Sequence, residues 1–122
     1  MAKESTKENS KIKAITAIME QYTEMTVWIA AAKAANAQYI DCEPPFNVDV
    51  KIIKVRSIRD FVTSLPDSRE KLFLHYHYIS GMSMEKTAEL LSISPRTAYR
   101  LRLRALDYAA RIYFGNRRIK AG

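Results

Sequence analysis

A helix-start signal precedes four arginines in the segment SPRTAYRLRLRAL, which begins at Ser94. The Ser94 side chain can cap the first turn of a helix, and Pro95 suits the first helical position, where the missing N–H costs no hydrogen bond. Arg96, Arg100 and Arg104 are spaced four residues apart and form one ridge of like charge. Because guanidinium groups bind phosphates and guanine edges, this ridge indicates nucleic-acid chemistry.

The N-terminal half of this helix supplies the candidate contact residues. Ala98, Leu101 and Ala105 share its apolar face, and the N-terminal turn of a recognition helix is the part that enters the major groove. The predicted DNA-binding residues are Ser94, Pro95, Arg96, Thr97, Tyr99, Arg100, Leu103 and Arg104. Arg102 lies near the core edge and is expected to pair with an acid or reach the backbone. The alternative is that the arginines only solvate a helix face.

A second, shorter helix is predicted just before this one. Ser83 can cap it, and SIS (92–94) is as short as the turn of a helix-turn-helix. With Met84 counted as the first residue, small or apolar residues occupy the fifth, tenth, fifteenth and eighteenth places, where the helices contact each other: Ala88, Ile93, Ala98 and Leu101. Ser92 departs from the pattern. The ninth place often has a left-handed backbone and is usually glycine, so a serine costs up to about 1–2 kcal/mol.

The rest of the chain also predicts helices. No run alternates with period two for long enough to indicate a strand, so we expect an all-α fold of about five helices. The first three are expected at about residues 10–40, 48–64 and 68–80, with Gly81 ending the third. The inward face of the third is expected to hold Leu72, Phe73, Tyr76 and Ile79.

The chain divides into two parts in this interpretation. Residues 1–47 comprise a disordered leader, the first eleven residues, and a long N-terminal helix, which serves as an oligomerisation or packing arm. Residues 48–122 are the DNA-binding domain. Apolar residues of the first helix recur at alternating steps of three and four, as in a heptad, and Asn36 sits where a polar residue can fix the register of a dimer. The same stripe is equally consistent with a helix that folds back on its own domain.

The charge of the chain is concentrated at one end. The net charge of the chain is +7. Residues 81–122 account for +6 of it, because they hold nine basic and three acidic side chains. This excess indicates either a solubilising surface or a polyanion-binding module. Cys42 is the single cysteine, which excludes an internal disulfide and favours a reducing, cytoplasmic location. No apolar run approaches the roughly 20 residues of a membrane span, and the polar N-terminus has no signal-peptide pattern.

Catalytic and metal-binding motifs are not found. His75 and His77 in HYHY are two residues apart and project about 200° from each other on a helix, whereas shared metal ligands need a spacing of four. One histidine is expected to face solvent and the other to fill a polar edge of the core. We therefore expect no enzyme activity, no metal and no cofactor.

The segment SLPDSREKLFLHYHYISGMSMEKTAELLSISPRTAYRLRLRAL (64–106) resembles region 4 of bacterial sigma factors. It is more similar still to phage and prophage late-gene transcription regulators of the ArpU/RinA type. The shared features are the Leu-Pro-Asp entry, the YISGMS link and the SPRTAYR opening of the last helix. The resemblance implies a sigma-region-4-like bundle that binds promoter DNA, with Pro95, Arg96, Tyr99 and Arg100 at the reading positions, and that acts on host RNA polymerase or at a late promoter.

The leading function is therefore sequence-specific regulation of transcription on double-stranded DNA. No segment resembles the part of a sigma factor that melts promoter DNA, so a stand-alone sigma factor is not expected. Two alternatives remain open. One is a sigma-like accessory module that docks on RNA polymerase, and the other is a small terminase-type subunit, which also joins a helix-turn-helix to an oligomerising helix.

Overall fold

The computed structural model describes the backbone of residues 2–121 and the side chains of residues 9–115. Over this range the chain forms five α-helices and one π-helical turn, with no strand. The elements are α1 (Ala2–Asn36), α2 (Asp49–Ser64), α3 (Arg69–Leu74), η1 (His75–Ile79), α4 (Met84–Leu90) and α5 (Pro95–Ala121). The predicted all-α fold with a long N-terminal helix is confirmed.

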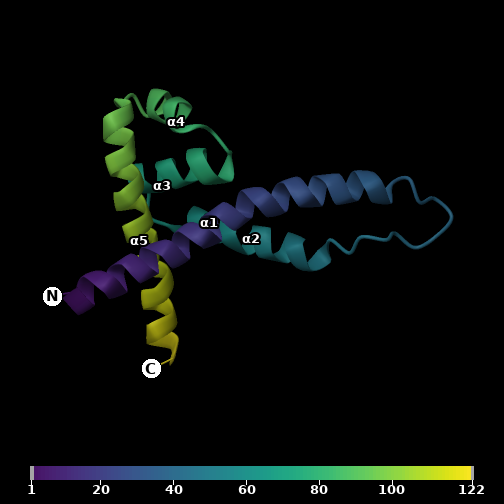
Figure 1. The fold of residues 1–122 in the computed structure, drawn as a ribbon, viewed down its shortest axis with the longest axis horizontal. Helices are drawn as coiled ribbons and strands as arrows, with labels where there is room; N and C mark the ends of the chain where they lie inside the picture. The colour runs from purple at the N-terminus through teal and green to yellow at the C-terminus, as the bar shows by residue number, and fades with distance from the viewer. Residues whose placement is uncertain (1, 122) are drawn as a thin grey trace.

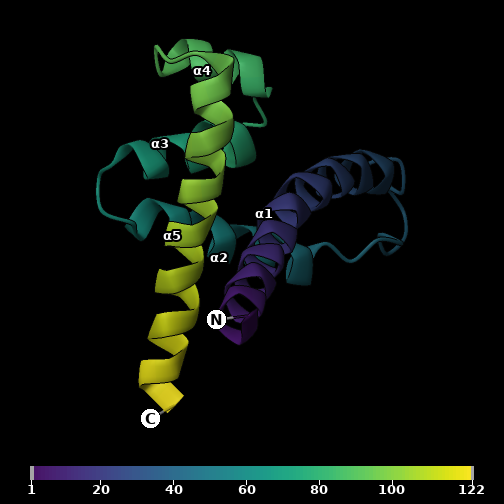
Figure 2. The same ribbon diagram turned by 60° about the vertical axis from the view of Figure 1, so that its left-hand side comes forward.

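The helices form two groups that meet along α5 (Figure 1). The helices α1 and α2 pack against each other, and their far halves project from the rest of the molecule together with the loop of residues 37–48. We call this projection the arm. On the other side, α3 and α4 pack beside the first half of α5, which also crosses α1 (Figure 2). The last helix is thus held by contacts with α1, α3 and α4.

One hydrophobic core joins these elements. Its buried residues are Ile15, Met19, Val62, Leu65, Phe73, Leu74, Tyr78, Leu101, Ala105, Leu106, Ala109 and Ala110. Burying a valine, leucine, isoleucine, methionine or phenylalanine side chain contributes about 1.5–3 kcal/mol, and a buried alanine contributes less. Since α1 supplies Ile15 and Met19, the first 47 residues take part in the same core as the C-terminal helices.

The first helix begins earlier and ends earlier than predicted. It starts at Ala2, although the first eleven residues were expected to be a disordered leader, and it ends at Asn36 rather than near residue 40. No glycine or proline occurs before Pro44, and the lysines and glutamates of the first turns are good helix formers. A polar composition therefore did not prevent a helical backbone from residue 2 onward.

The heptad stripe of α1 is used within the chain. Ile15, Tyr22 and Ile29 on this stripe are buried by the other helices. The amide of Asn36 donates to the Phe46 carbonyl oxygen at 2.8 Å, and the Phe46 backbone N–H donates to Asn36 Oδ1 at 3.0 Å. Asn36 therefore closes the loop between α1 and α2.

The third predicted helix is divided. Ser68 caps α3 by accepting from the Lys71 backbone N–H at 3.1 Å, and the chain then widens into η1, where the Ser80 N–H donates to the His75 carbonyl at 2.8 Å. Leu72 was predicted to face inward but is 45% exposed, and Leu74 is buried instead. The predicted inward positions of Phe73 and Ile79 are confirmed, since Phe73 is fully buried and Ile79 packs on the core. The prediction was wrong at Leu72, about 100° around the axis from Phe73.

Candidate nucleic-acid interface

A tight turn connects α4 to α5. Ser83 caps α4 by accepting from the Lys86 N–H at 3.0 Å, as predicted. At the other end, the Ile93 N–H donates to the Ala88 carbonyl at 3.0 Å and the Ser92 N–H donates to the Glu89 carbonyl at 3.1 Å. This pair of bonds is the Schellman motif, which requires a left-handed residue just after the helix.

Ser92 is that left-handed residue, with a φ of 56°. It was identified from sequence as the place where glycine is usual, and the left-handed backbone is confirmed. Immediately afterwards, Ser94 Oγ accepts from the Thr97 N–H at 3.1 Å and donates to Thr97 Oγ1 at 2.9 Å. The predicted cap of α5 is therefore also confirmed, and it leaves Pro95 at the first helical position.

We expect Ser92→Gly to stabilise the protein by about 1 kcal/mol, because glycine has no Cβ to strain in the left-handed region. In thermal unfolding followed by circular dichroism this corresponds to a rise of roughly 3–6 °C. Ser92→Ala keeps a Cβ and should bring no gain. An equal or lower melting temperature for Ser92→Gly than for wild type would contradict the strain assigned to this turn.

The buried side of α5 and its exposed side separate clearly. Ala98 and Ala105 are 0% exposed and contact the core, as predicted. Leu106 and Ala110 are also buried, while Tyr113 packs edge-to-face on Phe61 of α2 with ring centroids 5.2 Å apart. The first half of the helix is thus fixed in rotation about its own axis.

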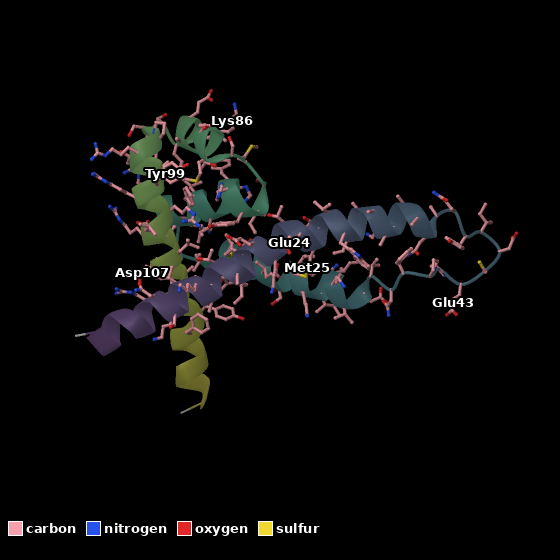
Figure 3. All side chains as sticks on the ribbon, viewed as in Figure 1. Glu24, Met25, Glu43, Lys86, Tyr99 and Asp107 are labelled. Atoms are coloured by element: carbon pink, nitrogen blue, oxygen red, sulfur yellow. The ribbon has the colours of Figure 1, made fainter. Side chains whose placement is uncertain are left out.

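All eight predicted DNA-binding residues lie on the exposed side: Ser94, Pro95, Arg96, Thr97, Tyr99, Arg100, Leu103 and Arg104. Figure 3 shows nitrogen-tipped side chains projecting from the edge of α5 that faces away from the rest of the chain. Tyr99 and Leu103 are 58% and 57% exposed, so large apolar side chains alternate with the arginines. We call this surface the α5 ridge.

The arginines of the α5 ridge are uncompensated. Among the described side chains, Arg96, Arg100 and Arg104 form no ion pair, whereas Arg111 further along the helix pairs with Asp107 at 3.1 Å. Like charges spaced four residues apart repel each other by an amount on the order of a few tenths of a kcal/mol per pair. The fold therefore presents three unpaired guanidinium groups in one row.

Arg102 differs from its expected role. It is half-buried and lines a pocket with Tyr78 and Glu20, but it forms no ion pair within the described residues. Burial raises the pKa of the Tyr78 phenol, and the neighbouring Arg102 guanidinium acts in the opposite direction. Arg102 therefore lies beside the Tyr78 phenol, with Glu20 in the same pocket, and faces away from the α5 ridge.

The two histidines behave as expected. His75 is exposed, and half-buried His77 makes a hydrogen bond between Nδ1 and the Met82 carbonyl at 2.8 Å. No group of three metal-ligating side chains occurs in the part of the chain that is described. Cys42 is exposed in the loop between α1 and α2.

No protein-family model, curated protein or solved structure matches this chain. Within the described residues, no helix combines the length and apolarity that crossing a membrane requires. The features of this chain that bear on its function are the geometry of the α4–turn–α5 unit and the charge of the α5 ridge.

Proposed function

We propose that this chain is a sequence-specific regulator that binds double-stranded DNA, with α4–turn–α5 as a helix-turn-helix and α5 as the recognition helix. The observation that carries the proposal is the row formed by Arg96, Arg100 and Arg104. These side chains are exposed and unpaired on the half of α5 that follows its cap. A helix presented in this way fits the width of the major groove.

In this proposal, some residues of the α5 ridge contact base edges and others contact phosphates. Arg96 and Arg100 lie within the first two turns of α5, the part of a recognition helix that reads base edges. Arg104 lies one turn further along and suits the phosphate backbone. Tyr99 and Thr97 suit phosphates or thymine methyl groups. The resemblance of residues 64–106 to late-gene regulators supports, in this proposal, a target at a phage or prophage promoter.

The test is selection of binding sites from random duplexes, followed by affinity measurements at increasing salt. We expect an enriched sequence and a linear fall of log K with log salt of about 0.9 per phosphate contacted. Four to six contacts per chain would then reduce affinity about 10²- to 10³-fold between 50 and 200 mM salt. A flat salt dependence, with no sequence enriched, would exclude DNA recognition by this surface.

A second candidate is a module that docks on RNA polymerase. The observation that favours it is the exposure of Tyr99 and Leu103, because a protein partner would cover such apolar side chains. Tyr99→Ala with Leu103→Ala should then abolish capture of purified polymerase, while Arg96→Ala with Arg100→Ala should not. The reverse result favours DNA.

A further inference from the structure

The arm carries a groove that the proposed DNA-binding unit does not use. The groove lies between α1 and α2 and encloses about 330 Å³. Its floor is formed mainly by the half-buried Ile52 and Val55 of α2, and beside them lie the small exposed parts of Tyr22 and Ile29 of α1, each 8% exposed. The groove is not evident in the sequence, because its residues come from two helices joined by a loop.

The rim of this groove is positively charged. Lys33 of α1 and Arg56 and Arg59 of α2 are exposed and line the groove. None of the three forms an ion pair with another described side chain, and this includes Asp60, which lies four residues after Arg56. The groove thus combines an apolar floor with three uncompensated cations.

We infer that this groove binds an acidic amphipathic helix of a partner protein. A helix of this kind places apolar side chains at spacings of three and four residues into such a floor, with carboxylates on its flanks reaching Lys33, Arg56 and Arg59. DNA phosphates would use the cations and leave the apolar floor uncovered. The surface is separate from the α5 ridge, so the inference goes beyond the proposed function.

A second copy of the chain is a poor occupant by charge. The helices α1, α2, α3 and α5 each carry more basic than acidic side chains. The exception is α4, with one lysine and two glutamates, but it is only seven residues long and buries Thr87 and Ala88 inside its own fold. The partner is therefore a different protein with an acidic helix.

The test uses three synthetic 18-residue peptides labelled with fluorescein. The first has leucines at helical spacing flanked by glutamates, the second has the same leucines flanked by lysines, and the third is polyglutamate of the same net charge as the first. We expect the full chain to bind the first peptide in fluorescence anisotropy at least about tenfold more tightly than the other two. Equal binding of polyglutamate would overturn the inference, because it would leave the apolar floor without a role, as would no binding of the first peptide.

One variant reverses two charges at the rim of the groove. Its control reverses one charge on the opposite face of α2. Arg56→Glu with Arg59→Glu should weaken binding of the first peptide about tenfold or more, as expected for reversed rim charges. Lys54→Glu, on the opposite face of α2, should leave it within about twofold. Unfolding temperatures of all variants identify any loss of fold. Equal effects of both changes in folded protein would overturn the inference.

Two further measurements distinguish an acidic helix in this groove from the other two possible occupants, which are DNA and a second copy of the chain. The Arg56→Glu, Arg59→Glu protein should keep the duplex affinity of wild type, and Arg96→Ala with Arg100→Ala should keep peptide affinity. Loss of duplex binding on reversing the rim charges, without peptide binding, would make the groove a phosphate contact. In sedimentation velocity, self-association that the rim variant abolishes would make the occupant a second copy. Either result would overturn the inference.

Discussion

Replacing Arg96 and Arg100 together by alanine is expected to reduce affinity for the selected duplex by about 30- to 10⁴-fold. Both side chains are exposed without ion-pair partners on the first two turns of α5. A bidentate arginine–guanine contact contributes about 1–3 kcal/mol of discrimination, and two such contacts give this range. Sequence preference should also relax, because alanine cannot distinguish bases at those positions. Electrophoretic or anisotropy titrations against the selected and a scrambled duplex measure both effects.

The matched control for charge is Arg111→Ala. Arg111 is also an exposed arginine on α5, but it is paired with Asp107 at 3.1 Å and lies beyond the α5 ridge. Its removal should change duplex affinity less than about threefold at physiological salt. If Arg111→Ala weakens binding as much as the double variant does, net charge and not the α5 ridge controls binding.

Phe73→Ala is expected to destabilise the protein by about 3–5 kcal/mol. Phe73 is 0% exposed and packs against the rings of His77 and Tyr78, with centroids 5.4 and 6.5 Å away. Truncating such a side chain loses its burial and leaves a cavity, and domains of this size have only about 5–15 kcal/mol of stability in total. Chemical denaturation should show a lower midpoint concentration of denaturant, and the midpoint temperature of thermal unfolding should fall by at least about 10 °C.

Leu72→Ala is the control for this position. Leu72 is adjacent in sequence and is 45% exposed, so its truncation should cost less than about 1 kcal/mol. The pair of variants tests the rotation of α3 directly. Equal losses at both positions would place Leu72 in the core and contradict the structure of α3.

The caps of α4 and α5 and the left-handed residue between them were predictable because their signals are local. Ser83 and Ser94 each accept a hydrogen bond from a backbone N–H only three residues further along the chain. The left-handed Ser92 is likewise determined by the two backbone bonds that end α4. The exposed row of arginines then follows from helical spacing once Ala98 and Ala105 face the core.

Features that depend on distant contacts were not predictable in the same way. The rotation of α3 and η1 is set by packing on α5 and α1, which brings Leu74 into the core and leaves Leu72 outside. The Asn36 side chain forms hydrogen bonds with the Phe46 backbone only because the loop of residues 37–48 returns to the end of α1. Arg102 meets Tyr78 for the same reason, since the two residues come from different helices.

The position of α5 in the core has a consequence for synthesis. This helix supplies Leu101, Ala105, Leu106, Ala109 and Ala110, which are five of the twelve core residues. It is also the last of the described elements to leave the ribosome, so the apolar faces of α1 and α3 emerge before the helix that covers them. Folding of the nascent polypeptide must therefore wait for the segment that bears the arginines. A stably folded form of this protein without its basic surface should not accumulate during translation.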